Sequence, residues 1–351
     1  MTIKKKKIRA AIVGFGRIGR ALFRLNDQKK FFNIVAINDI NPDPQNLAYL
    51  LQYDSEYGRF NKTVTADKSH LYINRRSVSL FHQAKIENIP WQSLKVDLVI
   101  DATGIYRNVL AAPKLLHQGV RKIIITHSPE EVDQTLILGV NHSNYRPQKH
   151  HLVSSSICDA VAVAPVLKII DRIFGIESGF LTTLHPWLSY QNLLDGQSAS
   201  WALPGTTYFH YPVGRSSPRS LIPKPTSAVE ATLKVLPHLK GSLRCMSFRI
   251  PTPVVGAANL YLRLKRQATL PKVHAAFNRF SKKQSWPIIN CNDKPLVSID
   301  FLGAEHSVIV DQRWTNLAGQ RHLYLVLWYD NEWGYSNHAL HLAKYITDKL
   351  K

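Results

Sequence analysis

The chain has 351 residues, 45% of them hydrophobic, which leaves room for about two domains with a large buried core. No stretch approaches the run of about 20 apolar residues that a membrane-spanning helix requires, so no membrane association is expected. The formal net charge of +21 favours anionic ligands, but no nucleic-acid motif accompanies it, so a dedicated nucleic-acid-binding protein is possible but not favoured. Cys158, Cys245 and Cys291 lack metal-ligand spacing and predict free thiols in a reducing cytoplasm, with no metal site.

The first half of the chain alternates between short apolar strands and helical segments. The predicted elements are a strand at residues 8–13, a helix at 17–26, and strands at 33–38, 96–101 and 122–126. Strands that alternate with helices are typical of parallel sheets covered on both faces. The pattern therefore predicts an α/β, Rossmann-type domain with a doubly wound parallel sheet over residues 1–157.

The second half changes character. From Asp159 onward, apolar residues recur at helical spacing until Gly175, which predicts a helix that ends at this glycine. Residues 158–332 are expected to form an α+β catalytic domain with a mostly antiparallel sheet. The predicted strands are residues 179–185, 243–249, 257–265 and 296–301.

Two further segments of the second half stand out. Residues 196–215 are too long for an ordinary connection, which indicates a functional or a mobile loop. The pattern of residues 335–350 predicts an amphipathic helix. The C-terminal segment 333–351 is therefore expected to pack back on the first domain.

A glycine-rich hexapeptide, Gly14-Phe15-Gly16-Arg17-Ile18-Gly19, stands between the first predicted strand and its helix. In this pattern the first glycine allows a tight turn, the second lets a pyrophosphate approach, and the third lets helix and strand pack closely. Asn38 and Asp39 end the second strand, where a carboxylate can accept hydrogen bonds from the adenosine ribose and repel a 2′-phosphate. A glycine turn with a helix cap is the alternative, but the context favours an NAD site.

Cys158 stands at the start of the predicted helix, and His185 follows at the end of a predicted strand. A helix N-terminus and a neighbouring histidine both favour the reactive thiolate. Beside a dinucleotide site, this pair predicts covalent aldehyde chemistry coupled to hydride transfer; an inert buried thiol is the alternative. Asp159 leaves two interpretations open. It would raise the thiol pKa if it faces the sulfur, and it would be a favourable first-turn acid if it points away.

Several motifs resemble glyceraldehyde-3-phosphate dehydrogenases, and the similarity runs from about residue 8 to residue 345. They are residues 14–20, 35–39, 53–55 (Tyr-Asp-Ser), 139–141 (Gly-Val-Asn), 248–253 (Phe-Arg-Ile-Pro-Thr-Pro) and 328–337 (Trp-Tyr-Asp-Asn-Glu-Trp-Gly-Tyr-Ser-Asn). The last of these is highly specific. Residues 175–179 are also similar to the erythrose-4-phosphate dehydrogenase branch of the family.

The resemblance implies an enzyme in which Cys158 attacks the aldehyde, His185 accepts a proton, and NAD takes a hydride to leave a thioester. Asn331 matches the residue that holds the nicotinamide carboxamide, and Tyr335 the residue packed near that ring. The other implied ligand positions are Thr103 and Thr126 for the cofactor and Arg215, Thr226 and Arg249 for substrate phosphate groups. The resemblance also implies a homotetramer, because residues 196–215 align with a segment that reaches a neighbouring subunit's cofactor.

The chain departs from the family pattern around the nucleophile. The family writes Ser-Cys-Thr-Thr-Asn where this chain has Ile157-Cys158-Asp159-Ala160-Val161, and Leu188, Tyr190 and Ser227 replace further phosphate-site residues. Each lost hydrogen bond to a charged group costs about 1.5–3 kcal/mol, so phosphate binding is expected to be weaker by several orders of magnitude. Two hypotheses follow: a dehydrogenase whose thioester passes to phosphate or water, and a catalytically impaired NAD-binding or scaffold paralogue able to contact RNA.

Overall fold

The computed structural model describes residues 7–350 and divides the chain into two compact units. The first unit contains the chain through Thr135, residues 145–155 and the chain from Ala339 onward; the second contains residues 136–144 and 156–338. Residues 1–6 and 351, which belong to the expected first domain and C-terminal segment, lie outside the described residues. Within the described part, no helix is long and apolar enough to cross a membrane.

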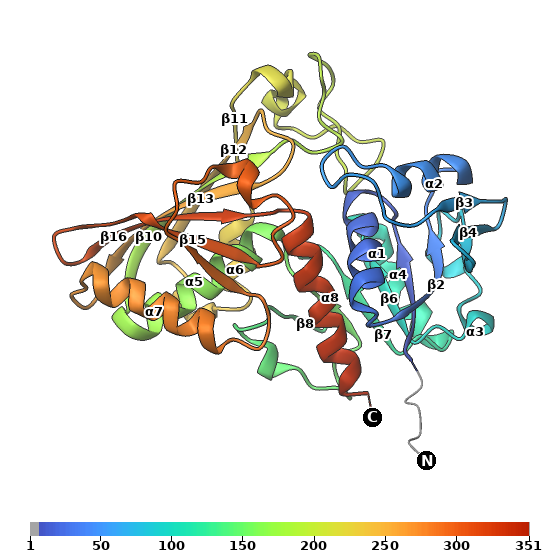
Figure 1. Cartoon of the computed structure of the whole chain (residues 1–351), viewed down its shortest axis with the longest axis horizontal. Helices are drawn as coiled ribbons and strands as arrows, with labels where there is room; N and C mark the ends of the chain where they lie inside the picture. Colours follow the sequence, from blue (N-terminus) through green and yellow to red (C-terminus); the bar gives the residue numbers. More distant parts are fainter. Residues whose placement is uncertain (1–6, 351) are drawn as a thin grey trace. The chain divides into compact units, whose positions relative to one another are not determined.

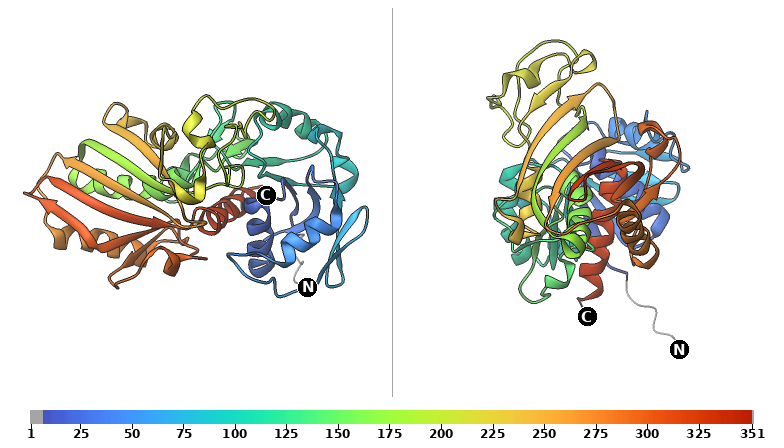
Figure 2. Two further views of the ribbon diagram at one scale, coloured as in Figure 1. Left: turned by 90° about the horizontal axis from the view of Figure 1, so that it is seen from above. Right: turned by 90° about the vertical axis from the view of Figure 1, so that its left-hand side faces the viewer.

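The first unit is built on a mostly parallel sheet in the order β3-β4-β5-β2-β1-β6-β7-β9-β8 (Figure 1). Its elements are β1 (Arg9–Val13), α1 (Arg17–Lys29), β2 (Asn33–Asn38), α2 (Pro44–Gln52), β3 (Val64–Ala66), β4 (His70–Ile73), β5 (Arg76–Phe81), η1 (Ile86–Asn88), α3 (Trp91–Leu94), β6 (Leu98–Asp101), α4 (Tyr106–His117), β7 (Lys122–Ile125), β8 (Gln134–Thr135) and β9 (Leu152–Ser154). Because β2 lies on one side of β1 and β6 on the other, right-handed crossovers carry α1 and α4 to opposite faces of the sheet (Figure 2). The predicted doubly wound architecture is confirmed.

The central strands of this sheet are nearly continuous apolar runs, as expected for strands covered by helices on both faces. Val99, Leu115 and Ile123 are fully or almost fully buried together with Trp91 in the core beneath α4. Each buried aliphatic side chain of this kind contributes about 1.5–3 kcal/mol. The buried core therefore holds the parallel strands in fixed positions, and with them the loops that follow β1, β2 and β6.

The second unit has a mostly antiparallel sheet in the order β11-β12-β10-β13-β16-β15-β14, in which only β10·β12 and β14·β15 pair in parallel. Its elements are η2 (His142–Asn144), α5 (Cys158–Phe174), β10 (Ile176–Pro186), η3 (Tyr211–Gly214), η4 (Ser217–Arg219), β11 (Ile222–Lys224), α6 (Ala228–Leu233), η5 (Pro237–Leu239), β12 (Leu243–Ile250), β13 (Gly256–Leu264), α7 (Leu270–Lys283), β14 (Ile289–Asn292), η6 (Ser298–Phe301), β15 (Val308–Ala318) and β16 (His322–Tyr329). Helix α8 (Trp333–Asp348) follows, and its residues from Ala339 onward belong to the first unit. Helices α5, α6 and α7 pack on one face of the sheet (Figures 1 and 2).

One predicted strand is wrong. Residues 296–301 alternate apolar side chains as a strand would, but Ser298–Phe301 forms the 3-10 helix η6. The Asp300 carboxylate accepts a hydrogen bond from the Val297 backbone nitrogen at 2.8 Å, which stabilises the turn. The actual strands of this region, β14, β15 and β16, were not predicted. The predicted helix is confirmed as α5, and Gly175 ends it with φ = +69°.

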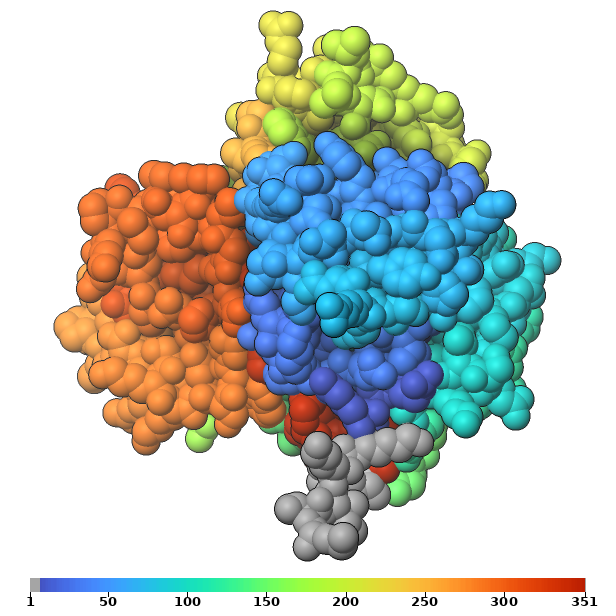
Figure 3. Space-filling view, turned by 45° about the vertical axis from the view of Figure 1, so that its right-hand side comes forward, coloured from blue at the N-terminus to red at the C-terminus, as the bar shows by residue number. Residues whose placement is uncertain are grey.

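The segment between β10 and β11 contains only the short helices η3 and η4 and one isolated bridge, between Ala199 and Thr207. It lies at the surface of the second unit, in yellow-green in Figure 3. Leu194 and Phe209 are 81% and 85% exposed. Clustered apolar side chains at a surface are a feature of regions that bind another protein.

Candidate active site

The glycine loop after β1 is shaped by close backbone packing. A Cβ on Gly14, whose φ is +83°, would lie 2.8 Å from the Thr103 backbone nitrogen, and a Cβ on Gly19 would lie 2.0 Å from the Gly14 carbonyl oxygen. A Cβ on Gly16 would meet nothing within 4 Å. The first and third glycines are thus required by the fold. The second faces open space at the start of α1, where a pyrophosphate could approach backbone N–H groups.

Asp39 lies beside this loop at the end of β2. Its Oδ2 accepts a hydrogen bond from the Phe15 nitrogen at 2.6 Å, and the Gly14 nitrogen donates to the Asn38 carbonyl at 2.8 Å. The end of β2 and the glycine loop are therefore held together beside the boundary between β1 and β6, where the crossovers change direction. Ligands of doubly wound sheets bind at such a position.

The two threonines expected near the cofactor both bond to Asp101, the last residue of β6. Thr103 donates its hydroxyl to the Asp101 carboxylate at 2.6 Å, and Thr126 donates its hydroxyl to the Asp101 carbonyl at 3.0 Å. Arg17 and Ile18 begin helix α1, where the Arg17 side chain forms an ion pair with Asp54 at 2.9 Å. The residues predicted for the dinucleotide within the first unit thus surround the carboxyl ends of β1, β2 and β6, an arrangement that fits NAD.

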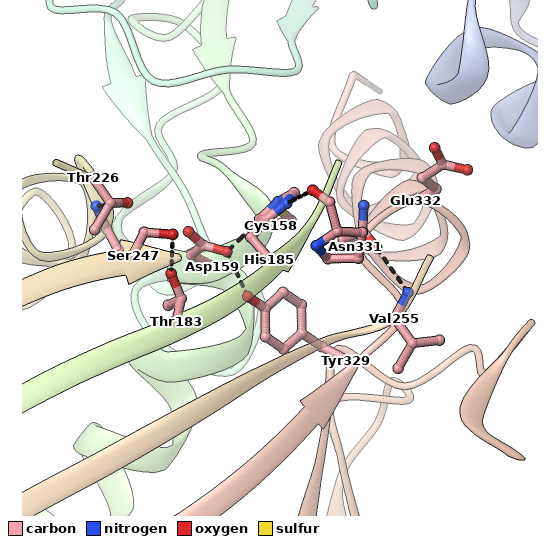
Figure 4. A network of polar contacts seen from close by, with 12 residues as sticks. Cys158, Asp159, Thr183, His185, Thr226, Ser247, Val255, Tyr329, Asn331 and Glu332 are labelled. Carbon is pink, nitrogen blue, oxygen red and sulfur yellow. Dashed lines mark hydrogen bonds and ion pairs between the residues drawn. The ribbon is translucent and has the colours of Figure 1, made fainter. Parts of the chain in front are cut away.

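The predicted catalytic pair lies within the second unit. Cys158 is the first residue of α5, His185 lies near the end of β10, and Cys158 Sγ is 3.5 Å from His185 Nε2 (Figure 4). His185 Nδ1 is 2.7 Å from the Pro186 carbonyl oxygen, so Nδ1 carries the hydrogen and the Nε2 lone pair faces the sulfur. This is the arrangement of a nucleophile and its base.

Asp159 turns its carboxylate toward this pair. Its Oδ1 lies 3.7 Å from Cys158 Sγ and 4.0 Å from His185 Nε2, and it accepts a 2.7 Å hydrogen bond from the Tyr329 hydroxyl (Figure 4). Asp159 is only 5% exposed. The interpretation of Asp159 as a first-turn acid that points away from the thiol is therefore wrong.

The carboxylate outweighs the helix N-terminus at the sulfur. Two unit charges 3.7 Å apart interact by about 4 kcal/mol at an effective dielectric constant near 20, whereas a helix terminus contributes about 0.3–2 kcal/mol. Burial, reinforced by the charge of Asp159, accordingly raises the pKa of the Cys158 thiol well above its ordinary value. At neutral pH Cys158 is therefore a thiol, which must lose its proton before it can act as a nucleophile.

His185 is suited to that task. Burial, together with the positive charge of Arg249, lowers the pKa of His185 to about 4. The imidazole is therefore neutral at pH 7, with a free lone pair on Nε2. The resting pair consists of a neutral thiol and a neutral base.

Two strained backbone positions flank the cluster. Ser156 and Val255 have φ values of +64° and +69°, a region that costs about 1–3 kcal/mol for a residue other than glycine. The Tyr335 hydroxyl donates to the Ser156 carbonyl at 2.9 Å, and the Asn331 side-chain oxygen accepts from the Val255 nitrogen at 3.1 Å. Both residues predicted for the nicotinamide thus brace the backbone of the second unit near Cys158.

Two cations accompany the cluster. The register of β10 and β12 places Arg249 opposite His185, and Arg249 is 7% exposed with an Nε that has no hydrogen-bond partner among residues 7–350. Burial and the charge of Arg249 lower the pKa of Lys224 to about 8. Sequence reasoning missed Lys224, although it stands two residues before Thr226 in the same segment. It also assigned no role to Tyr329, although it lies in the most specific motif.

The other two predicted substrate ligands are engaged locally. Arg215 pairs with Asp195 at 2.7 Å on the exposed loop, and the Thr226 hydroxyl accepts from the Ala228 nitrogen at 3.2 Å. Arg249 is thus the predicted phosphate ligand whose charge acts on Cys158 and His185. Phosphate binding by Arg215 and Thr226 stays a prediction.

The raised thiol pKa predicts an unusual pH dependence of alkylation. Only the thiolate reacts, so below a raised pKa its fraction, and the rate of iodoacetamide modification of Cys158, should grow about tenfold per pH unit up to about pH 9. Asp159→Thr removes the facing charge and should accelerate alkylation at pH 7 at least about tenfold. Peptide mass spectrometry would follow Cys158, with Cys291 of the same chain as the internal reference. A rate plateau below pH 8 in the unaltered protein would contradict the assignment.

Comparison with known proteins gives consistent matches over both units. Residues 8–109 match the family model described as the NAD binding domain of glyceraldehyde 3-phosphate dehydrogenase, and residues 157–331 match that of its C-terminal domain. The chain is 34% identical to glyceraldehyde-3-phosphate dehydrogenase 2 of Bacillus subtilis over 98% of both chains. It is 35% identical to glyceraldehyde-3-phosphate dehydrogenase 1 of Saccharomyces cerevisiae over 97% of this chain and 99% of the relative.

Proposed function

Because the chain belongs to the glyceraldehyde-3-phosphate dehydrogenase family, we propose that it oxidises an aldehyde with NAD through a thioester on Cys158. The observation that carries this proposal is the 3.5 Å approach of Cys158 Sγ to His185 Nε2 at the start of α5. A neutral imidazole with its Nε2 lone pair directed at a thiol is poised to remove the thiol proton.

The residues of the chain account for each proton and bond. Cys158 Sγ attacks the aldehyde carbon while its proton passes through His185 Nε2 to the carbonyl oxygen, giving a hemithioacetal. His185 then removes the hydroxyl proton as the carbon loses a hydride, which restores the C=O bond and leaves a thioester. Bound NAD supplies the chemistry of accepting that hydride. Water or phosphate then attacks the thioester carbon and the C–S bond breaks, which releases the acyl group. The proton held by His185 returns to the sulfur, and the proton of the attacking group leaves to solvent.

Cofactor residues are proposed by their match to the family and by their geometry. The glycine loop and Asp39 of the first unit suit the pyrophosphate and the adenosine ribose. In the second unit, the Asn331 oxygen already accepts from Val255, which leaves the Nδ2 hydrogens as donors for the nicotinamide carboxamide. Asp39 would also repel a 2′-phosphate, which favours NAD over NADP.

The charges suggest an anionic aldehyde and a weakened phosphate acceptor site. Buried Arg249 and half-buried Lys224 favour a phosphorylated or carboxylated substrate. Asp159 occupies the position of a family hydroxyl and aims its carboxylate at the sulfur, where it would repel an attacking phosphate. We therefore propose water as the acyl acceptor, with a carboxylic acid as the product.

Measurement of NADH formation with and without phosphate tests both the dehydrogenase activity and the choice of acyl acceptor. Purified protein with NAD and a panel of phosphorylated and neutral aldehydes is expected to produce NADH at a rate that changes less than about twofold when phosphate is omitted. Several hydrogen bonds to phosphate, each of about 1.5–3 kcal/mol, are missing in this chain. An acyl phosphate formed in a phosphate-dependent manner would overturn the choice of acceptor. The absence of NADH with every aldehyde would overturn the dehydrogenase and favour the scaffold hypothesis.

We further propose that the protein is cytoplasmic and assembles as a homotetramer. The face of the second sheet opposite its helices exposes Phe180 and Tyr261, which are 61% and 38% exposed and directly paired across β10 and β13. The segment 187–221 adds further exposed apolar side chains. Burial of such surfaces between subunits would remove them from water. Sedimentation velocity that shows only a monomer would contradict this assembly.

A further inference from the structure

Three side chains with metal-binding atoms converge at the start of α5. Cys158 Sγ, Asp159 Oδ1 and His185 Nε2 all lie within 4.8 Å of one another, with separations of 3.5, 3.7 and 4.0 Å (Figure 4). A tetrahedral zinc ion with ordinary bond lengths would set the sulfur about 3.6 Å from the nitrogen and about 3.5 Å from the oxygen. It would set the nitrogen about 3.3 Å from the oxygen. Small side-chain rotations, which move atoms by less than about 1 Å, would complete this geometry.

The ligand atoms are already oriented by outer contacts. His185 donates from Nδ1 to the Pro186 carbonyl, so its Nε2 lone pair is fixed toward the cluster. Asp159 Oδ1 accepts from the Tyr329 hydroxyl and still has a second lone pair. Carbonyl and hydroxyl contacts of this kind hold metal ligands in place in known sites.

Charge balance also suits a divalent ion. One thiolate, one carboxylate and one neutral imidazole together neutralise a charge of +2, which reduces the cost of holding the ion in a buried cluster. Arg249 and Lys224 face the same cluster and oppose a cation. They also favour an anion or a hydroxide at the fourth position.

We propose that Cys158, Asp159 and His185 form a site for Zn²⁺ or a similar divalent transition metal, with one open coordination position. The ion binds Sγ as the thiol proton leaves to solvent, so one proton is released per ion and no oxidation state changes. Bound metal occupies both the nucleophile and its base and therefore blocks the dehydrogenase reversibly. Cysteine spacing alone predicted no metal site. The third ligand is Asp159, where the family pattern has threonine.

Cobalt titration of the intact protein tests the site without aldehyde or NAD. We expect one equivalent of Co²⁺ to produce a thiolate-to-cobalt band in the near ultraviolet, and Zn²⁺ to displace it because zinc binds such ligands more tightly. Zinc should also suppress alkylation of Cys158, and a chelator should restore it. Cys158→Ser should abolish the band, whereas Cys291→Ser should leave it unchanged.

The decisive comparison is Asp159→Thr, which restores the family residue and keeps the cysteine–histidine pair. Loss of an outer contact usually weakens metal binding 10–100-fold, so loss of a direct ligand should weaken it at least about 100-fold. Should Asp159→Thr unfold by circular dichroism, Asp159→Asn provides the same test with a side chain of equal size. Equal affinity in Asp159→Thr and the unaltered protein, or no cobalt band at all, would overturn the site. Neither outcome depends on dehydrogenase activity.

Discussion

Replacing Cys158 with serine is expected to reduce NADH formation by about 10⁴-fold or more. A serine hydroxyl is far less acidic than a thiol, and the Asp159 carboxylate at this position further disfavours an anion. Loss of a covalent nucleophile typically costs this much because the remaining machinery cannot form the intermediate. The rate of NADH formation in a stopped-flow instrument would measure the loss for both the burst and the steady state.

Cys291→Ser is the matched control for this variant. Cys291 is also partly exposed, it lies on β14, and it is not part of the catalytic cluster, so its replacement should leave the rate of NADH formation within about twofold. NAD affinity of Cys158→Ser, measured by quenching of tryptophan fluorescence, should also be unchanged. Retention of more than about a tenth of the activity by Cys158→Ser would show that the nucleophile is another group.

The second large effect is expected for His185→Asn, with a fall in kcat of about 10²–10⁴-fold. The asparagine amide can still donate to the Pro186 carbonyl, as His185 Nδ1 does, but it offers no base to Cys158. The loss should therefore appear mainly in kcat rather than in KM.

The pH dependence of the rate distinguishes loss of the base from a structural defect. The lowered pKa of His185, about 4, keeps the base unprotonated above about pH 5, so activity should fall only as pH approaches 4 from above. His238→Asn is the control, because His238 forms only a largely exposed ion pair with Asp171, a kind of pair worth about 0–1 kcal/mol. A His185→Asn variant with nearly full kcat would remove His185 from the mechanism.

The sequence predicted most of the architecture because the relevant signals are local. The glycine spacing of residues 14–19 and the helical pattern after Cys158 both correspond to the observed β1–α1 turn and α5. The prediction went wrong at residues 296–301, where apolar alternation indicated a strand. The Asp300 carboxylate bonded to the Val297 nitrogen, only three residues away, gives η6 instead. Alternation reports which side chains are apolar, but it does not report a competing side-chain-to-backbone bond.

Likewise, only part of the candidate site could be predicted from the sequence. Cys158, His185 and Arg249 were identifiable from motifs, whereas the burial of Lys224 beside them depends on how β11 and β12 pair. In a parallel register such as β10·β12, residues 64 positions apart in the chain become direct neighbours. No local pattern in the sequence encodes that juxtaposition.

By itself, the sequence determined the α/β fold class and the glycine loop, and it predicted Cys158 and His185 as nucleophile and base, because these follow from short-range patterns. Only the tertiary structure decided what Asp159 does. Its direction is set by the hydroxyl of Tyr329, which lies 170 residues later at the end of β16. A buried carboxylate takes the orientation in which it finds a hydrogen-bond donor, and that donor exists only once α5 has packed against the completed sheet.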